Sequence, residues 1–495
     1  MIPLEYRLRD SVRLEPTPAG SWRVLCVQPL SVVSVNAAAA RLLERTRHGA
    51  SIADMAGDLC SGEERIFTVC EYFRARGILE VGRATVDPDV APSVTVIVPT
   101  RDRAGDLDEC LRAVAHLDYP RDRLEVIVVD DGSADAATVA RVVARRGWRL
   151  LANERNRGPA YSRNRAAREA AGEILAFVDS DCVAGRGWLR ELTPYFSWDR
   201  VGAVGGRTTG YYTESRLDRY EEVASPLDMG AHLLLEARGT DTFYVPTCNL
   251  LMRRSVYQEV GGLREDLLVG EDVDLCWRLR ARGVYLVYAP EGVVRHKHRN
   301  RLGAMLRRRA DYGTSEATLH ALHPDKRKRF PLALAPLATV AILSAAMVAL
   351  EPWLLPVCLA PPLWDGTRRA LHLRRKGIHL PARRVWSTVL RGHLSMLYFT
   401  YFHLVRYYLA PLAAAGLLAP GVWLLTAFAL LYAAAVDYST RRPCMGYPAY
   451  LGYYLAEHAA YQSGVIAGCV RSRTFRSYLP AIQRGYAWRP GPGAE

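Results

Sequence analysis

The sequence predicts an α/β protein in three parts: a small winged-helix-like α+β module over residues 1–86, an α/β domain over 92–300 and a helical, membrane-associated region over 301–495. Strands alternate with helical stretches in the middle part, which is typical of a mostly parallel sheet. Two long apolar runs occupy the last part. At 495 residues the chain is also too long for one ordinary core.

The first part combines short strands with three short helices. Residues 22–27 form an expected strand, and Asn36 is a suitable N-cap for a helix over 36–43. Further helices are expected from Ser51 and over 66–73. The simplest interpretation is an accessory structural module, joined to the next part by a linker at 86–92.

The middle part contains three near-continuous apolar runs, at 94–98, 124–129 and 174–178. Such runs are typical of strands that are covered on both faces. Each run ends in polar residues that include aspartate. Since ligands bind beyond the carboxyl ends of strands in sheets of this kind, we expect a binding site at that edge.

The ends of the first two strands predict a nucleotide-binding cleft. Pro99, Thr100 and Asp102 follow the first strand, where an aspartate can accept a hydrogen bond from a uracil or ribose. Asp131 follows the second strand, in a tight turn that also offers a helix N-cap. Taken alone, the first loop is better explained by a solvated carboxylate, and the second can be simply a turn between strand and helix with Ser133 as cap. As neighbours they form a base-binding cleft.

A glycine and an arginine begin the next helix. Gly158 permits close backbone approach, and the helix that follows can aim Arg163 at a diphosphate. A capped helix with an exposed arginine explains the same residues. Both interpretations stay open.

The triplet Asp179-Ser180-Asp181 ends the third strand and predicts a divalent metal site. Mg²⁺ or Mn²⁺ prefers such oxygen ligands and would offset charge on a departing nucleotide diphosphate. His296 follows a later strand and could complete this site, and we prefer it to His298. A surface histidine without a metal is the commoner case.

An acidic cluster at the start of a helix predicts the catalytic base. Direct displacement at an anomeric carbon needs a carboxylate that takes the proton of the acceptor hydroxyl. Asp272 is the expected base, with Glu271 and Asp274 in support. Acidic residues also favour the positive end of a helix for purely structural reasons.

The last part carries the membrane signal. Residues 330–364 contain one charged residue, Glu351, and residues 407–436 contain none, so each run is long enough to cross a bilayer. Residues 389–408 mix aromatic and basic side chains, as in an interfacial helix. Prolines in both runs also allow re-entrant hairpins, so the number of crossings stays open.

Charge and cysteine usage indicate the compartment. The net charge is +14, and the basic residues concentrate after Arg295 beside the apolar runs. This placement fits an anionic cytoplasmic membrane surface better than nucleic acid. The ten cysteines include no C-x-x-C pair, and the N-terminus lacks a secretory pattern. We expect a cell-membrane protein whose nucleotide-binding domain faces the cytoplasm.

Taken together, the motifs resemble those of family 2 glycosyltransferases. They occur in the order Val-Ile-Val-Pro-Thr-Arg-Asp, Val-Asp-Asp-Gly-Ser, Asn-x-Gly-x-x-x-x-Arg-Asn, Val-Asp-Ser-Asp and Gly-Glu-Asp-x-Asp-Leu-x-x-Arg. The resemblance implies a GT-A fold and inversion at the anomeric carbon. It implies nucleotide contacts for Asp102 and Asp131, a metal at Asp181 and a base at Asp272. Gln-x-x-Arg-Trp is absent, so long processive polymerisation is not expected.

The arrangement as a whole is similar to the glycosyltransferases of mycofactocin biosynthesis, and residues 29–37 are similar to small peptide-binding chaperone domains of redox-cofactor pathways. This similarity implies a UDP-glucose donor and a peptide-derived redox cofactor as acceptor. One alternative is a glycosyltransferase that acts on a lipid or cell-envelope glycan. Another is a non-catalytic membrane scaffold, which the intact aspartates disfavour.

Overall fold

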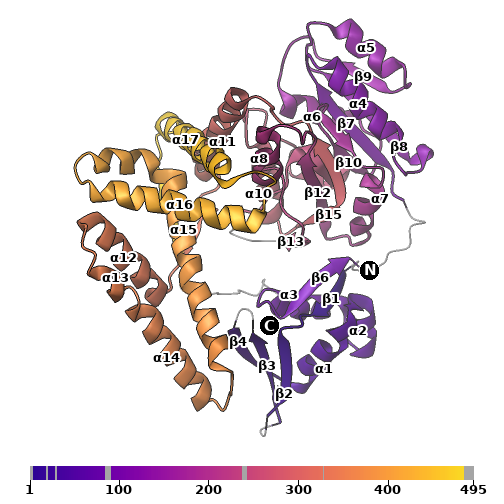
Figure 1. The fold of residues 1–495 in the computed structure, drawn as a ribbon. Coiled ribbons are helices and arrows are strands. Elements are labelled where there is room, and N and C mark those ends of the chain that lie inside the picture. The colour runs from indigo at the N-terminus through magenta and orange to yellow at the C-terminus, as the bar shows by residue number, and fades with distance from the viewer. Residues whose placement is uncertain are drawn as a thin grey trace.

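The structure is a computed structural model that describes residues 4–17, 20–27, 30–83, 91–236, 242–326 and 328–483. It contains a small N-terminal part, a central sheet covered by helices, and a C-terminal array of long helices (Figure 1). Most of the expected linker at 86–92, and Pro29 in the chaperone-like stretch, lie outside the described residues.

The N-terminal part contains two three-stranded sheets, with strand orders β5-β1-β6 and β2-β3-β4. The expected strand at 22–27 is confirmed, and Asn36 caps the first helix by accepting a hydrogen bond from the Ala39 amide at 2.9 Å. The elements are β1 (Leu4–Leu8), β2 (Val12–Pro16), β3 (Trp22–Val27), β4 (Leu30–Val35), α1 (Ala37–Arg45), β5 (Ala50–Ser51), α2 (Ile52–Asp58), α3 (Glu63–Arg74) and β6 (Leu79–Arg83).

The central sheet has the strand order β11-β15-β12-β14-β10-β7-β8-β9, with β13 paired to β15. Its strands are β7 (Val94–Thr100), β8 (Leu124–Asp130), β9 (Arg149–Ala152), β10 (Ile174–Phe177), β11 (Cys182–Ala184), β12 (Val201–Gly210), β13 (Leu234–Glu236), β14 (Leu250–Arg253) and β15 (Tyr285–His296).

The sheet is mixed, which corrects the expectation of a mostly parallel one. Strands β10, β7, β8 and β9 are parallel, as predicted. Strand β14, however, runs antiparallel to both of its neighbours, β10 and β12, and β11 and β13 run antiparallel to β15. The half of the sheet that contains the three predicted aspartate loops is therefore the parallel half.

Helices cover both faces of this sheet, which explains the continuous apolar runs. Val96 and Val98 of β7 join a core with α4 and α5, while Ile97 joins a second core with α6 and α10. Alternate side chains of a strand point to opposite faces, so each face needs apolar residues of its own. The helices are α4 (Ala104–Ala115), α5 (Ala136–Ala144), α6 (Pro159–Glu169), α7 (Trp188–Leu192), α8 (Arg216–Ala224), α9 (Arg254–Glu259) and α10 (Glu271–Ala281).

The N-terminal part packs against the central domain through aromatic side chains. The rings of Phe67 and Trp198 lie 4.8 Å apart, and the Trp198 indole donates a hydrogen bond to Glu64 at 3.3 Å. Buried residues of both parts belong to one hydrophobic cluster. The two parts therefore share a core.

The C-terminal region is helical, as predicted. Its elements are α11 (Leu302–Leu322), β16 (Arg329–Pro331), α12 (Leu334–Ala349), α13 (Leu354–Val357), α14 (Ala360–Arg375), α15 (Ala382–Gly416), α16 (Gly421–Arg441), α17 (Tyr447–Arg471) and β17 (Ala481–Gln483).

The two apolar runs do not form two membrane-length helices. The first is divided among β16, α12, α13 and the start of α14. The second is shared by α15, which continues through Pro411, and α16, which begins after Pro420. In the described chain one helix, Gly421–Arg441, is long and apolar enough to cross a membrane.

Close helix packing holds this region together, and a buried ion pair attaches it to the central domain. A Cβ atom at Gly464 would lie 1.9 Å from the Ala310 carbonyl oxygen, so α11 and α17 pack backbone to backbone. Arg309 of α11 lies 2.6 Å from Glu221 of α8 and 3.3 Å from Glu457 of α17. These buried charges neutralise one another across three helices.

Candidate active site

The predicted loops meet at one edge of the central sheet. Strand β7 lies between β8 and β10, and all three run parallel. Their carboxyl ends therefore place residues 100–103, 130–133 and 178–181 side by side. The first residues of α6 and α10 face this edge, as the contacts below establish.

Asp102 links the first two loops. Its backbone amide donates to Ser133 Oγ at 2.9 Å, and its carboxylate accepts from the Ala134 amide at 2.7 Å. Ser133 in turn donates to Asp130 at 2.5 Å. Asp102 has a φ of 53°, an uncommon conformation for a residue other than glycine. Its side chain remains 49% exposed, so the carboxylate can still reach a ligand.

Asp131 holds the third loop. Its carboxylate accepts hydrogen bonds from Asn153 Nδ2 at 2.7 Å and from the amides of Arg157 and Gly158 at 2.8 Å each. The side chain is buried. Asp131 thus fixes the loop that leads into α6.

Arg163 bridges two carboxylates that come from distant parts of the chain. The side chain is 4% exposed, donates to Asp179 at 2.5 Å and lies 3.3 Å from Glu271. Burial raises the pKa of Asp179, but the Arg163 guanidinium outweighs it and holds the pKa below its usual range. The buried position excludes the exposed-arginine interpretation. The Arg163 side chain connects the end of β10 to the start of α10.

A candidate metal centre forms where β11 meets β15. Cys182 pairs with His296 across these antiparallel strands, and the potential ligand atoms of Asp181, Cys182 and His296 all lie within 4.8 Å of one another. His296 Nε2 lies 3.7 Å from the Asp181 carboxylate. A carboxylate and an imidazole on facing strands can bind a divalent ion together.

Burial affects His296 and Cys182 in ways that separate them as ligands. Burial lowers the pKa of His296 more than Asp181 raises it, so the imidazole is neutral and can ligate. Burial raises the pKa of the Cys182 thiol well above its usual value, so the thiol stays protonated. The residues present therefore fit a metal at Asp181 and His296.

Two arginines near Asp181 were not singled out from the sequence. Arg103 forms an ion pair with the Asp181 carboxylate, and Arg299 lies 3.7 Å from it. Arg103 directly follows Asp102 in the chain, and this adjacency was the available signal. These cations balance the charge of Asp181 where a metal would otherwise do so.

His298 belongs to a different contact. Its Nε2 lies 2.9 Å from Asp218, which forms a capping box with Ser215 at the start of α8. This contact holds His298 against α8, while His296 lies next to Asp181.

Asp272 lies at the start of α10, where Gly270 precedes the helix with a φ of 87°. Its side chain is half-buried and accepts a hydrogen bond from the Val273 amide at 2.8 Å. Burial, and then the nearby charge of Glu271, raise the pKa of Asp272 to about 7. A carboxylate with that pKa can accept a proton near neutral pH.

Asp274 has a structural position. It is buried, and its carboxylate accepts from Arg278 and contacts His323 Nε2, each at 2.8 Å. Burial raises the pKa of Asp274, but His323 and Arg278 outweigh it and lower the pKa overall. Asp274 therefore supports Asp272 indirectly, by joining α10 to α11.

Residues 95–261 match the family model described as Glycosyl transferase family 2. The chain is 35% identical over 275 residues to the pre-mycofactocin glycosyltransferase of Mycobacterium tuberculosis, with 54% of this chain and 57% of that protein covered. It is 29% identical over 249 residues to glycosyltransferase AglE of Haloferax volcanii, with 49% and 79% covered. The chain thus spans little more than half the length of the first of these relatives.

Among solved structures, the mannosyltransferase PcManGT from Pyrobaculum calidifontis, in complex with GDP-Man and Mn²⁺, aligns at a TM-score of 0.40 and 22% identity. The alignment covers 67% of this chain and 94% of that one. The match over residues 95–261 agrees with the resemblance of the central domain to family 2 glycosyltransferases.

Proposed function

We propose that this chain, whose central domain is a family 2 glycosyltransferase domain, is an inverting enzyme that moves a sugar from a nucleotide diphosphate to an acceptor hydroxyl. The supporting observation is the continuous set of contacts along one sheet edge. It runs from Asp102 through the neighbouring Arg103 to Asp181, and from Asp179 through Arg163 to Glu271, beside Asp272.

Asp272 is the proposed base. It takes the proton of the acceptor hydroxyl as that oxygen bonds to the anomeric carbon. The bond from the anomeric carbon to the donor phosphate breaks on the opposite side, and its electron pair leaves with the nucleotide diphosphate. Attack opposite the leaving group inverts the configuration at that carbon.

Asp181 and His296 would hold a Mg²⁺ or Mn²⁺ ion, which supplies positive charge beside the departing diphosphate. Arg103, which pairs with Asp181, would be near enough to contact the phosphates if an ion took its place on that carboxylate. Pro99, Thr100, Asp102, Asp131, Gly158, Arg163 and Asp179 are the proposed donor-binding residues.

The proposed donor is UDP-glucose and the proposed acceptor is a peptide-derived redox cofactor, mycofactocin or its precursor. The 35% identity to a pre-mycofactocin glycosyltransferase supports the acceptor. The N-terminal part, which shares a core with the catalytic domain, is the proposed peptide-binding module. UDP-glucose is the donor that the overall similarity to the glycosyltransferases of mycofactocin biosynthesis implies.

A second candidate acceptor is a lipid or cell-envelope glycan. One observation favours it: in the described chain, all of the large exposed hydrophobic side chains except Leu268 and Leu302 lie after residue 333. Apolar surface gathered in this way marks membrane interaction sites. The same surface supports the proposed location at the cell membrane, with the catalytic domain facing the cytoplasm.

Transfer from labelled UDP-glucose by the full chain tests the proposal. We expect transfer to the peptide-derived acceptor to require a divalent ion and to outcompete transfer to a lipid extract. Labelling of the lipid alone would select the second candidate. Failure to release UDP with any acceptor or with water would leave a non-catalytic scaffold.

A further inference from the structure

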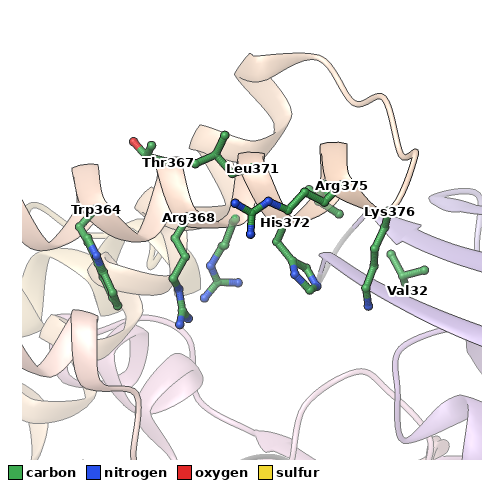
Figure 2. Close-up of a pocket in the computed structure, with 10 residues that line it drawn as sticks. Val32, Trp364, Thr367, Arg368, Leu371, His372, Arg375 and Lys376 are labelled. Carbon is green, nitrogen blue, oxygen red and sulfur yellow. The ribbon is translucent and has the colours of Figure 1, made fainter.

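A cavity of about 840 Å³ lies between α14 and the N-terminal sheet (Figure 2). Trp364, Arg368, His372 and Lys376 follow one another at intervals of four residues, so they share a helix face. Figure 2 shows their side chains projecting to the same side of α14, with Val32 of β4 nearby. The cavity thus presents three basic side chains in a row, with a tryptophan at one end.

The position of this cavity is fixed by packing around it. Leu25 of β3 forms a buried cluster with Leu373, Ile378 and Val385. Arg23 also donates to the Lys376 carbonyl oxygen at 3.4 Å. The N-terminal sheet therefore holds the end of α14 in place.

The charge around the cavity is strongly positive. Between Glu351 and Asp437 the sequence contains nine arginine and lysine residues and a single carboxylate, Asp365. That carboxylate is buried and pairs with Arg369 at 2.9 Å. Arg368 lies 4.0 Å from Asp365 and stacks over Trp364 at 4.8 Å, with its side chain 65% exposed. The cavity therefore offers positive charge for an anion.

Exposed apolar residues lie around α13 and the first turn of α14, before the basic row; of these, Trp364 shares the face of the basic row. Trp353, Leu359, Leu363 and Trp364 are all more than half exposed. Apolar side chains beside a basic row are typical of a helix that lies in a membrane interface, where the apolar part enters the lipid and the cations contact headgroups.

We infer that the edge formed by α13 and α14 docks on an anionic membrane and that the cavity receives the phosphate of an anionic phospholipid. The basic row supplies the charge complementarity, and the adjoining tryptophans and leucines supply the apolar contact. An acidic peptide would be served by the cations alone and gives no role to the exposed apolar edge. The inference does not depend on which acceptor the enzyme uses.

Vesicle binding by the full chain tests this docking surface. Vesicles of phosphatidylcholine are compared with vesicles that contain about one third phosphatidylglycerol, and we expect clearly tighter binding to the anionic ones. The double variant Arg368→Gln/Lys376→Gln should bind the anionic vesicles about 30-fold more weakly, since each cation near such a surface contributes about fivefold. Its binding to neutral vesicles should not change.

Two further double variants test the apolar contact and whether the position of the lost charge matters. Leu359→Ser/Leu363→Ser should weaken binding to both kinds of vesicle. Arg141→Gln/Arg145→Gln, which removes the same charge from α5 at the far end of the molecule, should change neither (Figure 1). Because the substituted side chains are exposed, circular dichroism melts of all variants should match the wild type.

Three results would overturn the inference. The first is equal binding of the wild type to neutral and anionic vesicles. The second is an Arg368→Gln/Lys376→Gln variant that keeps the full anionic preference. The third is normal vesicle binding by that variant combined with a raised KM for the acceptor, which would assign the cavity to the acceptor. Vesicle binding is measured without donor, so its failure is distinct from failure of sugar transfer.

Discussion

Arg163 and Asp179 form a buried ion pair with a hydrogen bond of 2.5 Å, and this pair joins the helix α6 to the end of strand β10. The same guanidinium reaches Glu271 at the start of α10. One side chain thus sets the spacing between the proposed metal side of the site and the proposed base.

Replacing Arg163 by methionine should disrupt this arrangement. Asp179 and Glu271 would lose a partner within the protein, which we expect to lower the free energy of unfolding by about 3 kcal/mol. The rate of sugar transfer should fall together with this stability. Urea denaturation measures the first effect. Arg168→Met on the exposed face of the same helix is the control and should change stability by less than about 0.5 kcal/mol. Equal stability of both variants would contradict the bridging role.

Asp272→Asn should reduce transfer by at least about a hundredfold and leave UDP binding nearly intact, because only proton removal is lost. Kinetics and UDP titration on the same preparation measure both. Folding raises the pKa of Asp272 to about 7, so this carboxyl lowers stability progressively as the pH rises from the ordinary aspartate range to about 7, and by a constant amount above it. The asparagine variant should therefore be at least as stable as the wild type at a pH of about 8. Substantial residual turnover would remove Asp272 from the role of base.

The pH dependence of the wild-type enzyme should report the same carboxylate. The base must be ionised, and the pKa of Asp272 is about 7. We expect kcat/KM to fall roughly tenfold for each pH unit below that value and to level off above it. A profile flat down to a pH of about 5 would mean that a carboxylate with an ordinary pKa acts instead.

The metal site can be tested by comparing two histidines. Chelation should abolish transfer, and added Mn²⁺ or Mg²⁺ should restore it. His296→Asn should raise the metal concentration needed for half-maximal activity by at least about tenfold, because a ligand is lost. His298→Asn removes the contact with Asp218 and should leave this concentration unchanged. If His298→Asn raised this metal concentration more than His296→Asn did, the metal would be placed at His298.

Gly132 offers a test of the nucleotide-binding loops. Its φ is 71°, and an added Cβ would lie 2.7 Å from the Arg155 carbonyl carbon. Gly132→Ala should therefore cost more stability than Gly147→Ala, which has a φ of 67° but open space around it and should cost about 1 kcal/mol. Thermal unfolding gives both values. The Gly132 variant should also bind UDP more weakly, whereas equal losses would show that the close approach is unimportant.

The parallel half of the central domain could be predicted from the sequence because its signals are local. Strands β7, β8 and β10 are apolar runs that end in aspartates, and each lies within a few residues of its expected position. The antiparallel insertion of β14 could not be predicted. Its position between β10 and β12 depends on pairing with strands far away in the chain.

The residues of the candidate site could be predicted from the sequence, but the ion pairs that they form within the protein could not. A strand end identifies Asp181, but the ion pair between Arg103 and Asp181 requires two loops to be placed in space. Likewise, the spacing of Arg163 fits an exposed cation as well as a buried one. The strands β1 and β2 went unrecognised because each has only five residues, with charged side chains between the apolar ones.

The backbone contact between α11 and α17, with Arg309 held between Glu221 and Glu457, has a mechanical consequence. Arg309 ties α11 to α8 of the central domain and to α17 at the same time, so a movement of the helices relative to that domain would separate a buried ion pair. If those helices rest on lipid, we expect the proposed site to keep its distance from the lipid for as long as these ion pairs hold.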